Sequence, residues 1–313
     1  MSYTNNQLEN AINKGLVYLE NLLTSKPWAF SVNLCSRDRS LFFEEPENMH
    51  TQHPEAFTHF IALDLLGNNF SKLSRHKLAD SLLNSVHSTI NYFVNPTLFP
   101  DEVDTTALGY SSLIQSHLLK ADDVSEVAQI VFSNVNKFGI VEIYFNNAEI
   151  RRKNKICACV CANVLRLAYL LGEESKLENT ESYVFDWLES GNWKQGSLYY
   201  PSGFSFLYLC SNFAMTNCKV QKRFRPLLLS ALENSIEDCK FPLDYAQLLL
   251  TLENLRAKNY SKNLLEKLLS FQNVDGSWPP DSMWGNTHGR FYGGKPLSTI
   301  FAVGAITSAV KFS

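Results

Sequence analysis

Three acidic side chains and two threonines lie together in the segment Asp101–Thr106 (DEVDTT), which leads into an apolar stretch with helical spacing. Clustered carboxyl groups can exchange protons with a substrate when burial keeps one of them neutral. Asp, Glu and Thr are also common at helix starts, where they accept hydrogen bonds from free backbone N–H groups. Taken alone, the segment is explained better by helix capping than by chemistry.

Aromatic side chains follow the turn-like segment Gly196–Ser202 (GSLYYPS). The aromatic residues in and after this segment are Tyr199, Tyr200, Phe204 and Tyr208. An aromatic face attracts a cation by roughly 0.5 to 2 kcal/mol. Most aromatic side chains in a chain of this size are ordinary packing residues, so the stretch indicates a cation-stabilising wall only in combination with other evidence.

Basic side chains gather in the segments Arg151–Lys155 and Lys222–Arg225, and Lys295 follows two glycines in a further loop. Lysine and arginine in flexible loops can approach phosphate groups. For each cluster considered separately, solubility is the simpler explanation.

The cysteines and histidines do not have the spacing of a metal site. Cys157, Cys159 and Cys161 lie at the start of an apolar helical stretch, and side chains two positions apart on a helix do not face one site. We therefore expect buried small side chains there. The chain has seven cysteines, an odd number without a framework spacing, which predicts reduced thiols in a cytoplasm.

Apolar residues recur with helical periodicity along the whole chain, and strand-like alternation hardly appears. The predicted helices span about 5–24, 54–67, 76–94, 103–120, 122–136, 156–172, 178–189, 203–216, 225–237, 242–256, 260–271 and 297–311. Pro54 and Pro226 are expected in first helical turns, and Asp101 or Glu102 is expected to cap the helix near 103. Gly67 and Gly172 are expected to end helices.

Alternating helices of this number predict an all-α fold, an (α/α)6 toroid of helical hairpins. Open repeat superhelices fit the number of helices equally well, but no segment matches their signatures. A closed ring also buries its ends without capping repeats. No linker-like composition interrupts the chain, so a single domain over residues 1–313 is expected.

Composition and charge exclude several classes of protein. The chain is 45% hydrophobic and 19% charged, as packed proteins are, and its net charge of −3 gives no basic field for nucleic acid. No signal peptide is evident at the start, and no apolar run is long enough to span a bilayer.

The motifs resemble those of the class II terpene cyclases and their squalene–hopene-type relatives. Gln272–Pro279 (QNVDGSWP) looks like the QW repeat, in which Gln and Trp side chains tie helix pairs together. Glu102–Thr106 resembles the DxDD acid motif, and is closer to the DxDTT form of drimenyl-type sesquiterpene cyclases. Tyr199-Tyr200 and Cys161–Leu165 also resemble stretches of that subgroup.

The resemblance implies a role for each residue of these segments. The middle acid of the motif donates the proton, which assigns Asp104 as the general acid and Glu102, Thr105 and Thr106 as its supporting residues. The remaining residues that the resemblance assigns to substrate binding are Tyr199, Tyr200, Phe204, Tyr208, Trp278, Arg151, Lys155 and Lys295.

The implied function is protonation-initiated cyclisation of a linear isoprenoid diphosphate such as farnesyl or geranylgeranyl diphosphate. Glu102 stands where the family has its first Asp, and no phosphatase-like domain fits in this length. The product would therefore keep its diphosphate unless a separate phosphatase removed it. Mg²⁺ is a possible cofactor, with Glu44, Glu45 and Glu47 as candidate ligands.

Three other interpretations remain open at this stage. Protein prenyltransferase β-subunits share the toroid, but they need a zinc site for which His288 has no thiolate partner nearby in sequence. An (α/α) glycoside hydrolase would use two carboxylates across the ring, of which Asp104 supplies one. A non-catalytic toroid that binds an isoprenoid or a partner protein would explain the unusual Glu102 as a decayed acid motif.

Overall fold

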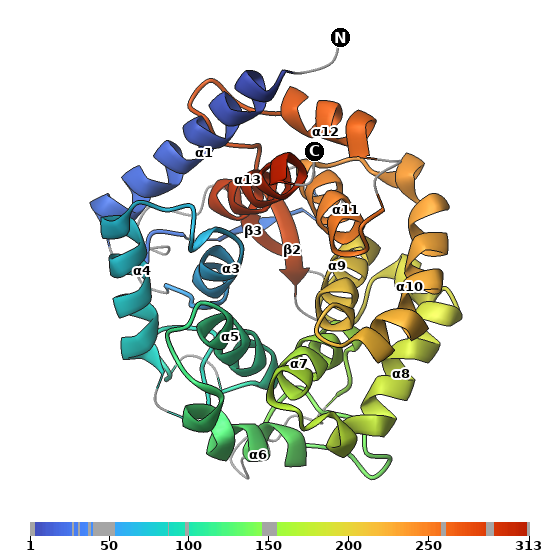
Figure 1. Ribbon diagram of the computed structural model, residues 1–313. Coiled ribbons are helices and arrows are strands. Elements are labelled where there is room, and N and C mark those ends of the chain that lie inside the picture. The colour runs from blue at the N-terminus through green and yellow to red at the C-terminus, as the bar shows by residue number, and fades with distance from the viewer. Residues whose placement is uncertain are drawn as a thin grey trace.

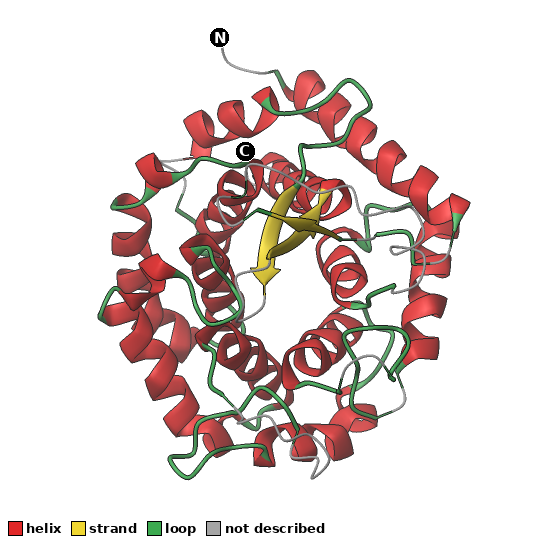
Figure 2. Ribbon diagram, turned by 180° about the vertical axis from the view of Figure 1, so that it is seen from behind, coloured by secondary structure: helices red, strands yellow, loops and turns green. Residues whose placement is uncertain are grey.

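The computed structural model describes residues 4–26, 28–30, 32–36, 39, 54–86, 88–97, 100–145, 155–257, 261–285 and 291–311. Within these residues, twelve α-helices form two concentric rings (Figure 1), and the same arrangement is seen from behind in Figure 2. The outer helices are α1 (Asn5–Ser25), α4 (Lys72–Ser85), α6 (Ser125–Ser133), α8 (Glu178–Glu189), α10 (Cys218–Glu233) and α12 (Ser261–Ser270). The inner helices are α3 (Phe57–Leu66), α5 (Val103–Gln115), α7 (Ala158–Leu171), α9 (Gly203–Ala214), α11 (Pro242–Asn254) and α13 (Lys295–Lys311).

The ring is closed, because the last inner helix packs against the first. Helix α13 contacts α11 on one side and α3 on the other, and it also contacts the outer helix α1. The all-α toroid predicted from the periodicity is confirmed. No helix in the part of the chain that the structure describes is both long and apolar enough to cross a membrane.

Burial explains why the two rings have different sequences. Helix α1 buries one stripe, formed by Leu8, Ala11, Gly15, Leu19 and Leu23. This is the spacing of a helix that faces a core on one side and water on the other. Helix α7 instead buries every residue from Ala158 to Ala168, because its neighbours surround it.

Two predicted helices differ from the structure. The helix expected over 76–94 is α4, which begins at Lys72 after the N-cap Ser71 and ends at Ser85. The residues after it are extended because they pair with the chain before α3: the backbone N–H of Ala56 donates to the Tyr92 carbonyl at 2.9 Å. Pro54 accordingly precedes the helix that it was expected to begin.

The helix expected from residue 225 is α10, which begins seven residues earlier, at Cys218. Its N-cap is Asn217, whose side chain accepts a hydrogen bond from the backbone N–H of Lys219 at 2.8 Å. Pro226 therefore lies inside the helix and not in its first turn. The pyrrolidine ring of Pro226 is tolerated there because it lies on the exposed outer surface of the toroid.

A three-stranded antiparallel sheet inside the ring was not predicted. Its strands are β1 (Asn33–Cys35), β2 (Asp281–Gly285) and β3 (Phe291–Gly294), in the order β1-β3-β2. Three to five residues are too few to show the alternation by which strands are detected. At Gly293 the strands approach so closely that an added Cβ would lie 1.8 Å from the Asp281 carbonyl oxygen, which only glycine allows.

The segment Gln272–Pro279 ties the last helix pair to the first, as the predicted QW-like repeat requires. The Gln272 side-chain amide donates to the Ala11 carbonyl of α1 at 2.9 Å. The Trp278 indole N–H donates to the Leu268 carbonyl of α12 at 2.8 Å, and its fully buried ring packs near Gly15. These bonds close the ring at its seam between α1, α12 and α13.

We predict that Trp278→Ala lowers the free energy of unfolding by about 3–5 kcal/mol, the usual cost of emptying a large aromatic site in a core. Urea unfolding followed by circular dichroism measures this change. Val274, in the same loop, is fully exposed, so Val274→Ala is the matched control and should change nothing measurable. A loss below about 1 kcal/mol for Trp278→Ala would show that the seam does not depend on this side chain.

Candidate active site

The N-terminal ends of the inner helices gather buried polar side chains at one end of the ring. Each inner helix alternates with an outer one that returns antiparallel, so the inner helices share one direction (Figure 1). At this end, Glu55 accepts the Thr58 N–H of α3 at 2.9 Å, and Asp281 accepts the Leu243 N–H of α11 at 3.2 Å. The segment Asp101–Thr106 opens α5 at the same end.

Glu102 is the N-cap of α5. Its two carboxylate oxygens accept the backbone N–H groups of Asp104 at 2.6 Å and Thr105 at 2.7 Å, and the side chain is buried. The capping role expected for Asp101 or Glu102 is thus confirmed for Glu102. Asp101 instead accepts hydrogen bonds from Thr89 and Asn91 in the preceding segment.

Asp104 is buried in the first turn of α5 and is held by two neighbouring elements. The Asn163 side-chain amide of α7 donates to Oδ1 at 2.7 Å. The Tyr200 hydroxyl, just before α9, donates to Oδ2 at 2.5 Å. Each carboxyl oxygen accepts one hydrogen bond and keeps a lone pair. The two hydrogen bonds fix the position of the group and leave both oxygens able to take part in a further contact.

Burial raises the pKa of the Asp104 carboxyl, although the hydrogen bonds from Asn163 and Tyr200 act in the opposite direction. Burial and the neighbouring Asp104 charge raise the pKa of Glu102. Two carboxyl groups so close together resist ionising at the same time. The pair therefore keeps one proton at a pH where exposed carboxyl groups have lost theirs.

The two threonines were expected to support the Asp104 carboxyl, but neither of them hydrogen-bonds to it. Thr106 Oγ1 donates to the Glu102 carbonyl at 2.8 Å and accepts the Ile90 N–H at 2.9 Å, so it joins α5 to the preceding segment. Thr105 is fully buried, and its hydroxyl lies beside the Glu102 carboxyl without a hydrogen bond of good geometry. Thr105 is therefore the more available of the two to a bound molecule.

The aromatic residues predicted from the sequence take different positions. Tyr200 binds the Asp104 carboxyl through its hydroxyl, which is a more specific contact than the wall position expected. The Tyr199 and Tyr144 hydroxyls lie 3.0 Å apart. Phe204 is buried in the first turn of α9, and Trp278 is committed to the seam contact with Leu268.

A small cavity of about 10 Å³ lies between the inner helices and the sheet. The side chains that line it are Phe57, Ile61, Asp64, Leu108, Tyr208, Leu209, Asn212 and Met283. Leu108 lies one helical turn after Asp104, on the same face of α5. Asp104 therefore lies one helical turn from a residue that lines this mostly apolar cavity. Tyr208 provides an aromatic face there, packed edge-on against Phe301.

The two predicted basic residues that the structure describes, Lys155 and Lys295, lie at the starts of different inner helices. Lys155 is exposed just before α7, and Arg151 lies outside the described residues. Lys295, at the start of α13, is half exposed and pairs with Asp275 at 3.9 Å.

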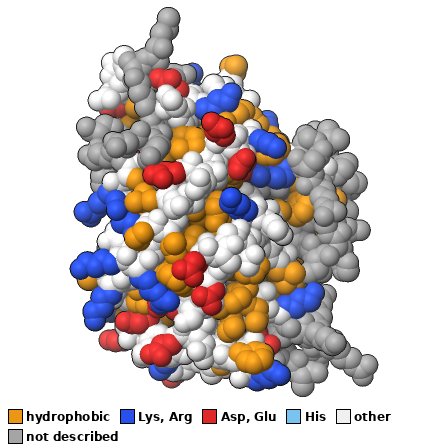
Figure 3. Space-filling model, turned by 90° about the vertical axis from the view of Figure 1, so that its right-hand side faces the viewer, with side chains coloured by type: hydrophobic (Ala, Val, Ile, Leu, Met, Phe, Trp, Pro, Cys, Tyr) orange, Lys and Arg blue, Asp and Glu red, His pale blue; other side chains and the backbone are white. Residues whose placement is uncertain are grey.

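The other basic segment, Lys222–Arg225, lies on the outer helix α10. Figure 3 shows this side of the molecule, where basic, acidic and apolar side chains alternate. Arg223 pairs with Glu181 at 2.5 Å and stacks over Phe185, and Arg225 donates to the Leu255 carbonyl at 3.1 Å. These contacts join α10 to the outer helix α8 and to the end of the inner helix α11.

The three clustered cysteines are buried, as expected, and Cys157 Sγ lies 3.0 Å from Ser197 Oγ. All seven cysteines fall within described residues and are free thiols. Among the described residues, no three His, Cys, Asp or Glu side chains gather closely enough to hold a metal ion. Glu44, Glu45, Glu47 and His288 lie outside the described residues.

Asn163 is the site residue that sequence reasoning did not assign. It had one visible signal, a polar side chain in the otherwise apolar stretch that became α7. Arg166, one turn further, interrupts the same stretch. The partner of each lies on another helix and far away in the sequence, so only the fold identifies what these two residues bind.

Comparisons with known proteins agree with this arrangement. The family model of the sesquiterpene cyclase astC-like C-terminal domain matches residues 40–171. Drimenol cyclase drtB of Aspergillus calidoustus is 30% identical over 228 residues, which cover 71% of this chain and 42% of that protein. The chain therefore spans less than half the length of this curated relative.

Solved structures share the fold at low sequence identity. Type II terpene cyclase MstE from Scytonema, without ligand, superposes with a TM-score of 0.69 at 13% identity, covering 98% of this chain and 100% of that one. An MstE variant in complex with its substrate geranylgeranyl dihydroxybenzoate gives a TM-score of 0.67 at 13% identity, covering 98% of both chains. A novel α-amylase from Clostridium perfringens gives 0.56 at 11% identity, covering 94% and 98%.

The amylase shows that this toroid also serves glycoside-hydrolysing proteins, so the fold alone does not distinguish the two classes. The sequence matches do distinguish them, because they lead to terpene cyclases. The resemblance to the class II terpene cyclases is confirmed: the chain is related in sequence to a drimenol cyclase and has the toroidal fold of the type II terpene cyclases.

Proposed function

We propose that this chain catalyses the protonation-initiated cyclisation of a linear prenyl diphosphate, with Asp104 as the proton donor. The proposal rests on a buried carboxyl group that Asn163 and Tyr200 hold, one helical turn before Leu108, which lines an apolar cavity. An alkene is a very weak base, so its protonation needs an acid that is neutral, desolvated and fixed in direction.

The contacts of Asp104 suit both halves of such a proton transfer. Before transfer, burial favours the protonated form of Asp104. As the new C–H bond forms, the proton leaves the carboxyl oxygen and the substrate becomes a carbocation. The Asn163 amide and the Tyr200 hydroxyl then stabilise the carboxylate that remains, as preorganised donors do at a developing negative charge.

Tyr200 is suited to remain a donor throughout. Burial and the neighbouring Asp104 raise its pKa well above the ordinary value for tyrosine, so its hydroxyl stays protonated. The carbocation that forms next to the pair would be attracted to aromatic faces such as that of Tyr208.

Farnesyl and geranylgeranyl diphosphate are the substrates we propose to test first, because the acid motif resembles the drimenyl-type form. Cyclisation starts at the alkene and breaks no bond to the diphosphate, so the product keeps that group until a separate phosphatase removes it. The cavity of about 10 Å³ is far smaller than the roughly 300–1,000 Å³ of ordinary ligand pockets. Binding therefore requires side chains such as the flexible Met283 to move aside.

Mg²⁺ remains part of the proposal, because it binds diphosphate substrates through their phosphates and one or two carboxylates, and the candidate ligands Glu44, Glu45 and Glu47 lie outside the described residues. Turnover assays with and without Mg²⁺ test this expectation. The free thiols of all seven cysteines support the cytoplasmic location that we propose.

We predict that Asp104→Asn reduces turnover of the accepted prenyl diphosphate by about 10²–10⁴-fold, the usual contribution of a general acid. Incubation of purified protein with each substrate, followed by mass spectrometry of the cyclic diphosphate, measures this. Asp101→Asn is the control, because Asp101 faces Thr89 and Asn91. Undiminished turnover by Asp104→Asn would exclude the acid assignment. Tight binding without turnover by the unaltered protein would support a binding role instead.

We predict that Tyr200→Phe lowers kcat by about 10²-fold and changes KM little, because the lost donor acts on the charge that develops during proton transfer. Tyr110→Phe is the matched control on α5, since the Tyr110 hydroxyl donates to the Ser88 carbonyl and not to the acid. Steady-state kinetics on both variants makes the comparison. Equal effects of the two substitutions would contradict a specific role for Tyr200.

We predict a pH–rate profile whose rate is highest at low pH and falls as pH rises through the raised pKa of the Asp104–Glu102 pair. The rate falls with rising pH because the proton donor must be protonated, and deprotonation at higher pH removes the proton that it would transfer. Glu102→Gln removes the second carboxyl with which Asp104 titrates as a pair, so the descending limb should move to lower pH, toward the pKa of Asp104 alone. An unmoved limb would show that Glu102 does not act on the acid electrostatically.

A further inference from the structure

A buried ion pair crosses the interior of the ring between helices that are not neighbours. Arg166 of α7 donates from Nη1 to Asp64 Oδ2 at 2.9 Å and from Nη2 to Asp64 Oδ1 at 2.6 Å. Asp64 belongs to α3, and α5 lies between α3 and α7 (Figure 1). Arg166 Nη2 also donates to the side chain of Gln115, at the end of α5. We call Asp64, Gln115 and Arg166 the cavity floor.

The cavity floor lies at the opposite end of the inner cavity from the acid. Along α5, Asp104 is in the first turn, Leu108 lines the cavity one turn later, and Gln115 is the last residue. Along α7, Asn163 donates to Asp104, and Arg166, one turn later, donates to Asp64 of the cavity floor. The interior is therefore layered, with an acid level, an apolar level and an ion-pair level.

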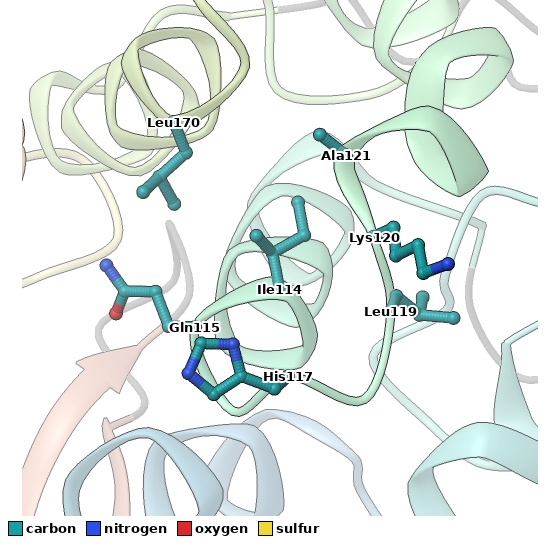
Figure 4. Close-up of a pocket in the computed structure, with 7 residues that line it drawn as sticks. All are labelled: Ile114, Gln115, His117, Leu119, Lys120, Ala121 and Leu170. Carbon is teal, nitrogen blue, oxygen red and sulfur yellow. The ribbon is translucent and has the colours of Figure 1, made fainter.

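On its far side, the cavity floor faces a hollow of about 620 Å³ on the protein surface. Figure 4 shows Gln115 of α5 and Leu170 of α7 extending toward this hollow. Asp64 lines the inner cavity, Gln115 lines the outer hollow, and Arg166 binds both. These three side chains thus separate the two spaces.

Stability does not explain why an ion pair stands here. Removing two charges from water costs several kcal/mol per ion, and apolar residues of similar volume are often as stable. Arg166 Nε is also buried without a hydrogen-bond partner, which adds to the cost. The Asp64–Arg166 pair at the end of an apolar cavity is better explained as a barrier to apolar groups. An apolar chain would have to displace the paired charges to extend beyond them.

We propose that the cavity floor sets the length of prenyl chain that the ring accepts, favouring farnesyl over geranylgeranyl substrates. Asp64 lies two turns beyond Phe57 on α3, about 10 Å along the helix axis. When the terminal alkene is at Asp104, the diphosphate is at the other end of the substrate and the apolar chain folds between them. Each added prenyl unit then brings more of this chain against the ion pair. The inference rests on the proposed function and names the residues that limit its substrate.

The test compares the affinities of farnesyl and geranylgeranyl diphosphate by isothermal titration calorimetry, with Asp104→Asn in every protein so that binding is measured without turnover. Asp64→Ala with Arg166→Ala removes both charges together and opens the floor to the hollow. This variant should raise the geranylgeranyl-to-farnesyl affinity ratio by about tenfold or more, as expected when an apolar pocket gains room. Asp64→Leu with Arg166→Met keeps the bulk without the charges, so its ratio should stay as in the unaltered floor.

Circular dichroism melting confirms folding, and Gln115→Ala, which leaves the buried pair intact, is the milder opening variant if the double one does not fold. An unchanged ratio in a folded opening variant overturns the proposal, as does an equal shift in the bulk-retaining control. Binding by an unaltered protein that shows no turnover would refute the proposed reaction alone, because the affinity ratios still test the floor. Binding of neither diphosphate would refute both.

Discussion

The structure depends on satisfying the backbone N–H groups at the starts of helices that are enclosed by protein. An outer helix can expose its first turn to water, but an inner helix of the closed ring cannot. Polar side chains therefore have to be buried at this end, and carboxylates such as Glu55, Glu102 and Asp281 accept these N–H groups. Buried acidic groups thus have a structural role at the starts of α3, α5 and α11, before any chemistry is considered.

In the segment Asp101–Thr106, helix capping and the proposed proton donation belong to two different residues. Glu102 caps the helix with both oxygens, which is the role that composition alone favoured. Asp104 is then released from capping and turns toward Asn163 and Tyr200. A helix N-terminus would lower the pKa of a carboxyl placed on it. Burial outweighs that effect at Asp104, whose pKa is raised.

The helices and the seam could be predicted from the sequence because both are recorded locally, in periodicity and in a short motif. The sheet could not, since its three strands are short and two of them lie far from the first in the chain. The partners of Asp104 and Arg166 were also beyond prediction. Arg166 and Asp64 are 102 positions apart, and nothing in either neighbourhood specifies the other. Such pairs can be identified only once the order of the helices around the ring is known.

Closure of the ring has a consequence for how the chain folds. Gly15 of α1 packs directly against Val303 of α13, so the first and last helices form one wall only when nearly the whole chain is available. Contacts of such high sequence separation slow folding, and early helices emerge from the ribosome with their inner faces uncovered. Until α13 has been synthesised, these apolar inner faces are uncovered and exposed to aggregation.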